Sequence, residues 1–462
     1  MNRVKNIFAI AMMLTLFSGV ASAQSTYELT VKDAVDLAYK NVVELKNAQV
    51  DYKIQQSVNK EITGRALPQI SANAGTQYYV KLPQILFPNA AQAGIYDVLV
   101  KENLLPQSTV IPSPTLQSLS FQQPWNLNVG ATVQQLLFQS DVFVGLQARQ
   151  TALELSNSII EQTREKIKDS AYRRYYAILI AQKQLHFLKE GEKRLEKLYR
   201  DDSIMYVNGF AERLDLDKVQ VQLNNLKSTT SLVESSVKLS YAGLKFALGL
   251  SQKDSVTLKE DLSTPAIKEN VLDDNFRYED RAEIRTLDFA KRLRELDVKR
   301  YRLGYLPTVA LSGNYSIVGQ GQKFFTDAET RWFKTASIGM NVNVPIFDGN
   351  QRKQRVQQAI LNVEKLENSS SLVKQGIDLQ QTITKELLRN ALLNLDTQER
   401  NMALAERVYN TTKKKFEAGL GSSFEVLQAD SDWQMAQANY FNSLYNSIIA
   451  KIGFQSSLGK LQ

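Results

Sequence analysis

The chain has 462 residues, a formal net charge of +8 from 56 lysines and arginines against 48 acidic residues, and no cysteine. The missing cysteines exclude disulfides, thiolate metal sites and lipid attachment at an N-terminal cysteine. The basic residues are scattered among the acidic ones rather than gathered in a stripe, so the charge does not predict a nucleic-acid partner.

Residues 1–23 have the form of a secretory signal peptide. Arg3 and Lys5 precede an apolar run from Ile7 to Val20, and small residues around Ala23 provide a cleavage site. This pattern predicts export, and we leave the segment out of fold reasoning. The remaining sequence has no run of about 18 apolar residues, so a role in a membrane would require β-strands.

Four later segments alternate apolar and polar residues with the period of a β-strand. We predict strands at about 69–81, 124–137, 307–318 and 333–347. The second side of each strand is small and polar but nearly uncharged, which favours membrane-crossing strands over an ordinary soluble sheet. Trp125 and Trp332 begin their strands, where interfacial aromatic residues of a membrane protein are expected. From the pattern alone, a soluble sheet stays open as the alternative.

Two long segments contain no proline, one between Trp125 and Thr264 and one after Pro345. Because a proline inside a helix costs about 3 kcal/mol, such segments favour helices. Apolar residues of the second segment repeat at spacings of four and seven, which suits coiled-coil packing. They are Ile383, Leu387, Ala391, Leu395 and Met402. We predict long helices at about 139–206, 211–248, 350–418 and 423–458, paired as two antiparallel hairpins.

Glycines interrupt both hairpins at their tips. Gly209 and Gly419 lie 210 residues apart, and Gly421 follows within the second turn. We expect Gly209 and Gly419 to end their helices in the left-handed conformation. Strand motifs recur as well, since "ALPQISANAG" resembles "YLPTVALSGN". The sequence therefore predicts a tandem duplication, with the first structural repeat at 24–264 and the second at 265–462.

Four strands in one chain leave two unpaired edges. No open edge can face lipid, and a closed single-chain barrel needs at least about eight strands. We therefore expect several chains to pool their strands.

Two stretches carry a resemblance to a known family. They are "FEAGLGSSFEVLQADSDWQMAQANYFNSLYN" at 416–446 and "YLPTVALSGNYS" at 305–316. In this order, and with the duplication, the chain resembles the TolC-like outer-membrane efflux proteins over essentially its whole mature length. The resemblance implies a mainly α-helical fold with a transmembrane β-barrel contribution. It further implies a homotrimer, whose twelve strands close one barrel and whose helices form a periplasmic tunnel.

The resemblance also implies a function. Members of the family are not enzymes and need no cofactor or metal. They lie in the outer membrane as exit ducts, and a periplasmic adaptor and an inner-membrane pump are their partners. We expect passive conduction of small molecules through a gated periplasmic aperture. The other open hypothesis is a soluble periplasmic coiled-coil protein with a structural or adaptor role.

In the family, the hairpin tips close the periplasmic end, and rings of carboxylates form a gate there. Three like charges around a small opening select cations. At the matching positions this chain has Asp215 and Glu425, with Gln428 where the family often has a second aspartate. Asp430 would supply a second ring only if its helix rotates. Whether the gate has one carboxylate ring or two is therefore left open.

The tip residues also have structural explanations. Ser422-x-x-Glu425 has the form of a capping box, so Glu425 either caps the returning helix alone or also lines the gate. Asp215 either lines the gate or stabilises a first turn through the helix dipole.

Three consecutive lysines precede the second tip: Lys413, Lys414 and Lys415. They either complement the C-terminus of a helix or form a contact with an adaptor. The sequence leaves open the cargo, the partner pump and whether the aperture is open or closed.

Overall fold

The computed structural model describes residues 26–111, 113, 115–260, 276–324 and 330–461, so the predicted signal peptide lies outside the described residues. The chain forms two compact units, each with segments from both predicted repeats. Unit 1 is Met1–Gln55, Thr151–Leu293 and Val363–Gln462, and unit 2 is Gln56–Gln150 and Arg294–Asn362. These units cut across the repeat boundary, and the division into repeats stays a prediction.

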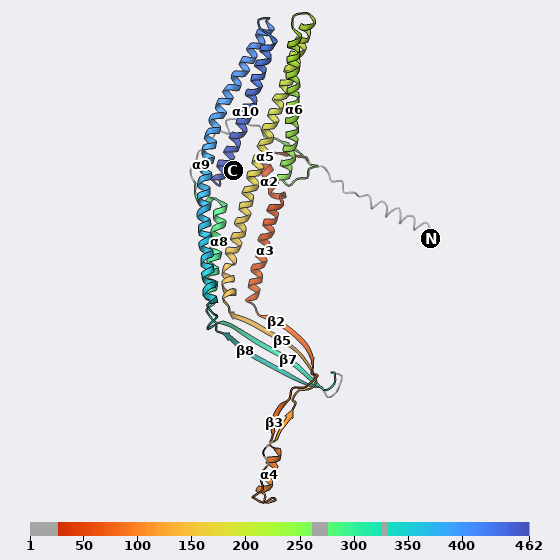
Figure 1. Ribbon diagram of the computed structural model, residues 1–462, viewed down its shortest axis with the longest axis vertical. Helices are drawn as coiled ribbons and strands as arrows, with labels where there is room; N and C mark the ends of the chain where they lie inside the picture. The colour runs from red at the N-terminus through yellow and green to blue at the C-terminus, as the bar shows by residue number, and fades with distance from the viewer. Residues whose placement is uncertain (1–25, 112, 114, 261–275, 325–329, 462) are drawn as a thin grey trace, which may run out of the picture. The chain divides into compact units, whose positions relative to one another are not determined.

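Unit 2 contains a four-stranded antiparallel sheet in the order β2-β5-β7-β8 (Figure 1). Its strands are β2 (Gln69–Tyr78), β5 (Trp125–Phe138), β7 (Thr308–Gly321) and β8 (Arg331–Asn343). β8 ends four residues before the predicted end at 347, close to Pro345, which has no amide to give to a ladder. The two edge strands of the sheet are β2 and β8, which are the first and the last of these four strands in the sequence.

The sheet has one apolar and one polar face, because the strand register places apolar residues beside apolar residues and polar residues beside polar residues. One row across the four strands pairs Ile70 with Val133, Val133 with Gly313, and Gly313 with Ile338. The adjacent row, which faces the other side, contains only small polar residues: Ser71, Thr132, Asn314 and Ser337. The apolar row is open, since Ile338 is 86% exposed. The chain by itself therefore leaves an apolar sheet face uncovered.

The segment between β2 and β5 contains regular structure of its own. It forms a two-stranded antiparallel sheet of β3 (Ile85–Asn89) and β4 (Thr115–Leu119), with helix α4 (Ala91–Lys101) between them. Pro88 lies within β3, because a strand in a two-stranded sheet has a free edge that accepts proline.

Unit 1 is built around two helical hairpins (Figure 1). The first comprises α5 (Ser140–Val207) and α6 (Arg213–Ala247), and the second α9 (Gln351–Glu417) and α10 (Ser423–Ser457). Residues 140–150 of α5 and 351–362 of α9 belong to unit 2. Ion pairs Lys227–Glu196 at 2.8 Å and Lys189–Glu234 at 3.7 Å show that α5 and α6 run antiparallel. The later residue on α5, Glu196, pairs with the earlier residue on α6, Lys227.

Shorter elements pack around these hairpins. They are β1 (Thr26–Leu29), α2 (Val31–Asn41), α3 (Val43–Arg65), β6 (Ser255–Leu258), the 3-10 turn η2 (Tyr278–Asp280) and α8 (Ala282–Leu303). β1 and β6 pair in parallel, and α2 begins with a capping box in which Thr30 and Asp33 exchange hydrogen bonds. The core beneath them includes Tyr175, which is fully buried and donates its hydroxyl to the Leu29 carbonyl at 2.9 Å.

Within the described ranges, no helix is long and apolar enough to cross a membrane.

Candidate functional site

Each hairpin turns at a glycine that adopts the left-handed conformation. Gly209 has a φ of 80° and Gly419 a φ of 74°. At the first tip, the amide of Phe210 donates to the Met205 carbonyl at 2.8 Å, and Gly209 donates to Tyr206 at 3.0 Å. This pair of bonds is a Schellman ending, which satisfies carbonyls that the helix leaves open.

The second tip repeats the same pattern. The amide of Leu420 donates to the Lys415 carbonyl at 2.9 Å, and Gly419 donates to Phe416 at 2.9 Å. Gly421 lies further along the turn, and a Cβ there would come within 3.1 Å of a carboxylate oxygen of Glu425. The absence of a side chain at Gly421 gives that carboxylate its space.

Asp215 lies in the first turn of α6 and is half-buried. Its carboxylate pairs with Lys218 at 3.3 Å, and the Lys218 ammonium lies 4.8 Å from the centre of the Phe424 ring in α10. Lys218 thus connects the acidic residue of one tip with an aromatic residue of the other. The two hairpin tips are neighbours in this unit.

Glu425 and Gln428 lie on the exposed side of α10. The amide of Glu425 donates to the Ser422 side chain at 3.3 Å, so Ser422 is the N-cap of α10. The carboxylate of Glu425 takes no part in that bond and stays available. Gln428 donates to Asp432 at 2.9 Å one turn further on.

Asp430 has a different environment, since it is only 1% exposed. Arg194 of α5 donates through Nε to one of its oxygens at 2.8 Å, and Gln434 donates to the other. A carboxylate enclosed in this way is committed to the helix packing, so Asp430 is not included in the gate proposed below.

Asp202, near the end of α5, is a second buried carboxyl that the sequence pattern did not single out. It is 1% exposed, and burial raises its pKa above the ordinary value of 3.8. The charges of Asp201 and Asp215 act in the same direction, while the side chain of Ser423 opposes them. A buried acid within a long helix gives no recognisable signal in a single sequence.

A cleft of about 190 Å³ lies between α5 and the end of α9. Lys413 is at its wall, and the next two residues, Lys414 and Lys415, are exposed in the last turn of α9. The charged residues that line the cleft have both signs: Glu190, Lys193, Arg194, Lys197, Asp201, Lys413 and Glu417. Among the three predicted adaptor-contact lysines, the structure places Lys413 in the cleft.

Aromatic residues gather at one end of the sheet in unit 2. The Trp125 ring lies 4.8 Å from Tyr78 and 4.9 Å from Phe324, measured between ring centres. Trp332 packs over Gly319 of the neighbouring strand, where a Cβ would come within 2.9 Å of the indole. Trp332 remains 52% exposed. The predicted interfacial tryptophans therefore mark the same end of the sheet.

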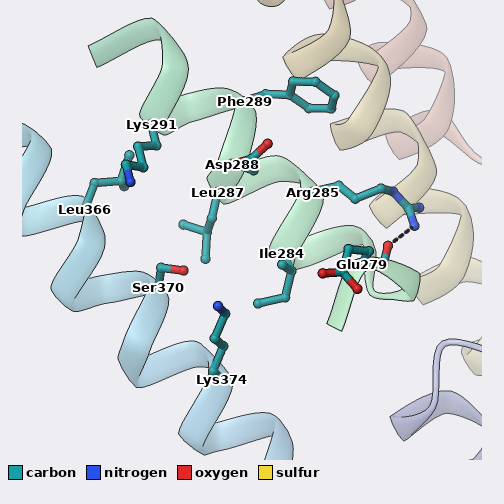
Figure 2. A pocket seen from close by; sticks show the side chains of 10 residues that line it. All are labelled: Glu279, Ile284, Arg285, Leu287, Asp288, Phe289, Lys291, Leu366, Ser370 and Lys374. Atoms are coloured by element: carbon teal, nitrogen blue, oxygen red, sulfur yellow. Dashed lines mark hydrogen bonds between the residues drawn. The ribbon is translucent and has the colours of Figure 1, made fainter. Parts of the chain in front are cut away.

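A cavity of about 410 Å³ in unit 1 lies between α8 and α9 (Figure 2). Its charged side chains already have partners: Arg285 donates to the Glu279 carbonyl at 2.8 Å, and Lys291 pairs with Glu367 at 2.8 Å. Lys374 lies over the Tyr278 ring at 5.4 Å. This arrangement provides no nucleophile with a base beside it.

In the part of the chain that the structure describes, no group of three or more His, Cys, Asp or Glu side chains could hold an ion. His186, the one histidine of the sequence, is exposed on α5 and lies against Phe187.

Known proteins are similar to this chain in sequence and in fold. Residues 102–250 and 279–460 match the family model described as "Outer membrane efflux protein". The chain is similar to "Outer membrane protein TolC" of Vibrio cholerae, with 20% identity over 397 residues that span 82% of this chain and 88% of the relative. It is also similar to "Alkaline protease secretion protein AprF" of Pseudomonas aeruginosa, with 19% identity over 340 residues, 69% of this chain and 66% of the relative. Among solved structures, CusC matches with a TM-score of 0.72 at 13% identity, over 94% of this chain and 93% of that chain.

Proposed function

This chain belongs to the outer membrane efflux protein family, and from that premise we propose that it is the exit duct of a tripartite efflux or secretion system. It is an outer-membrane protein and not an enzyme. In this role it conducts small molecules passively from the periplasm to the exterior.

The observation that carries the proposal is the four-stranded sheet with two unpaired edges and an exposed apolar face. Ile70 on β2 is 75% exposed and Ile338 on β8 is 86% exposed. Lipid accepts an apolar face but not an open strand edge. The apolar face needs contact with lipid, and each strand edge needs a partner strand. Both requirements are met when β8 of one chain pairs with β2 of the next, and three chains then close a twelve-stranded barrel. The helical hairpins of the three chains form the tunnel on the periplasmic side.

We place the gate of this duct at the hairpin tips. Asp215 and Glu425 each lie in the first turn of a returning helix, after the turns at Gly209 and Gly419. Threefold symmetry turns each carboxylate into a ring of three, and such rings favour cations. Gln428 is exposed one turn beyond Glu425 and lines the passage without a charge.

The cleft between α5 and α9 is our candidate for the contact with a periplasmic adaptor. Lys193, Lys197 and Lys413 line it together with acidic residues. Alternating charges suit an amphipathic helix of a partner, which can align its own charges with them. Lys414 and Lys415, in the last turn of α9, add two positive charges on the side of the cleft toward the tip.

Release of potassium ions from loaded liposomes tests the duct. We expect liposomes that contain the purified protein to lose potassium faster than empty liposomes or liposomes with heat-unfolded protein. A folded protein that stays outside the lipid and releases nothing would support the alternative function, a soluble periplasmic coiled-coil protein.

A further inference from the structure

The apolar face of the large sheet carries one charge. The four strands contain two charged residues, Arg331 and Lys334, and both lie on β8. Side chains of a strand alternate between its two faces, so Lys334 shares a face with Ile338, and Arg331 lies on the polar face. The register agrees, because Lys334 pairs with Ile317 of the apolar face. Lys334 is therefore a cation on the face that we assign to lipid.

The described part of the chain does not neutralise this cation. Lys334 is exposed, and among the described residues it has no hydrogen-bond or ion-pair partner. A cation on a lipid-facing surface is unfavourable, and its cost falls toward the interface with water. The ammonium therefore needs a counter-ion from the surrounding membrane.

Lys334 lies close to the outer boundary of the proposed barrel. β8 runs from the aromatic end of the sheet, where Trp332 lies, toward α9. In the proposed duct the helices lie in the periplasm, so the aromatic end of the sheet is the outer one. Lys334 is two residues inward of Trp332, about 7 Å along a strand that rises about 3.4 Å per residue. Its flexible stem can extend back over this distance and bring the ammonium to the headgroups of the outer leaflet.

An apolar hollow adjoins Lys334 on its inward side. The hollow has a volume of about 550 Å³, and six of its eight lining residues belong to the apolar face. Its small residues are Ala131, Gly313 and Ala336, and a Cβ added at Gly313 would meet no atom within 4 Å. Ala131 and Ala336 lie in the next row on this face, inward of the row of Lys334. An apolar chain that fills such a hollow gains dispersion contacts that the empty hollow lacks.

We infer that Lys334 and the hollow together bind a membrane lipid of the outer leaflet that bears a phosphate group. The ammonium pairs with the phosphate, and one acyl chain of the same lipid lies in the hollow. A free phosphate would satisfy the ammonium but would leave the hollow empty, so we assign the site to a lipid. The inference rests on the proposed function for the orientation of the sheet in the membrane. Threefold symmetry then gives three such sites around the barrel.

The indole of Trp332, on the same face as Lys334, provides the measurement. In the variant Trp125→Phe with Trp433→Phe, Trp332 is the one remaining tryptophan. Bilayers of phosphatidylcholine contain a stated fraction of either brominated phosphatidylcholine or brominated phosphatidic acid, because bromine on an acyl chain quenches a nearby indole. The test variant is Lys334→Gln. Its matched control, Arg331→Gln, removes the same charge from the polar face of the same strand.

We expect brominated phosphatidic acid to quench Trp332 at lower mole fractions than brominated phosphatidylcholine. Lys334→Gln should lower this preference about fivefold, which corresponds to about 1 kcal/mol for one basic residue at an anionic membrane surface. Arg331→Gln should leave the preference within twofold of the parent value. A preference that Lys334→Gln does not change overturns the inference. Loss of the preference when inorganic phosphate replaces chloride at constant ionic strength would assign the site to free phosphate and overturn the lipid.

A second measurement tests the hollow. Native mass spectrometry of the detergent-solubilised protein counts the phosphatidic acid molecules that remain bound. Ala131→Leu fills the hollow at an exposed position and keeps the charge, so it should retain fewer lipids than the parent, as should Lys334→Gln. Parental retention in Ala131→Leu would overturn the assignment of the acyl chain to the hollow.

The quenching also separates the site from the proposed function. If neither brominated lipid quenches Trp332 in a folded protein, this face does not meet lipid, and the barrel is rejected together with the site. If both lipids quench Trp332 equally, the barrel is supported and the lipid site alone is rejected.

Discussion

Acidic side chains near the two tips have four different environments. Glu425 is exposed, Asp215 is paired with Lys218, Asp430 is enclosed by Arg194, and Asp202 is buried. The first two are the charges that a permeating ion could meet, since their carboxylates are not used by the packing. The last two belong to the interior, so a carboxylate near a tip is not by that fact a gate residue.

Asp202 makes the stability of the protein depend on pH. Burial raises its pKa in the folded chain above the ordinary value of 3.8 that it recovers on unfolding. A raised folded pKa means that its contribution to stability is fully present below the unfolded value and is lost as pH rises through the folded value. At pH 7, where this carboxyl is ionised in the unfolded chain, Asp202 therefore disfavours the folded state.

We expect Asp202→Asn to raise the melting temperature by a few degrees at pH 7, because it removes a carboxyl whose charged form is disfavoured by burial. The gain should shrink as pH falls and disappear below about pH 4, where the unfolded chain is also protonated. Thermal melting followed by circular dichroism from pH 4 to pH 8 measures this. Asp201→Asn, at the half-buried neighbour, is the matched control and should change less. A gain that is the same at every pH would exclude ionisation as its cause.

At the scale of elements, the turns depend on backbone conformation rather than on contacts. A Cβ at Gly419 would meet no atom within 4 Å, but its φ of 74° is one that L-residues avoid. Gly419→Ala should therefore destabilise the protein by about 1 kcal/mol through backbone strain alone.

The matched control for this prediction is Gly376→Ala, in the interior of α9. A Cβ there also meets nothing within 4 Å, but the backbone is helical, so alanine should stabilise the helix by up to about 1 kcal/mol. The same chemical change thus has opposite signs at two positions of one hairpin. Melting temperatures of the two variants measure both, and equal shifts would contradict the assigned turn.

Much of the element order could be predicted from the sequence. Proline-free segments predict the long helices, because a proline inside them would break the hydrogen-bond ladder. Period-two alternation predicts the four strands of the large sheet. In contrast, β3, α4 and β4 are short, and Pro88 interrupts the alternation of the first. Local patterns of five residues are too weak to define such strands.

The candidate site could be predicted only in part. Gly209 and Gly419 are recognisable because a helix-ending turn demands glycine at one position. The contact between Arg194 and Asp430 joins residues 236 positions apart, and neither residue belongs to a local motif. Its existence depends on how α5 and α10 pack, which a single sequence does not reveal.

At the scale of the whole molecule, the proposed function depends on the assembly of several chains. One chain exposes an apolar sheet face and two strand edges, while its polar face carries uncharged side chains joined by hydrogen bonds such as Ser316 to Thr335 at 2.7 Å. In the trimer that we propose, three chains convert these features into a closed barrel with a polar interior and an apolar exterior. The same symmetry multiplies each tip carboxylate by three, so assembly creates both the passage and its gate.

The most direct measurement is the single-channel conductance and reversal potential of the assembled protein in a planar bilayer under a potassium chloride gradient. We compare the parent protein with Asp215→Asn and Glu425→Gln together, and with Glu234→Gln and Glu367→Gln together as a control for lost charge away from the tips. A gated duct predicts a small, cation-selective conductance for the parent protein and for the control. Only in the tip variant should the conductance increase and lose its selectivity. An assembled, folded protein without any conductance would contradict the duct, and a conductance whose reversal potential is the same in all three proteins would contradict the carboxylate gate.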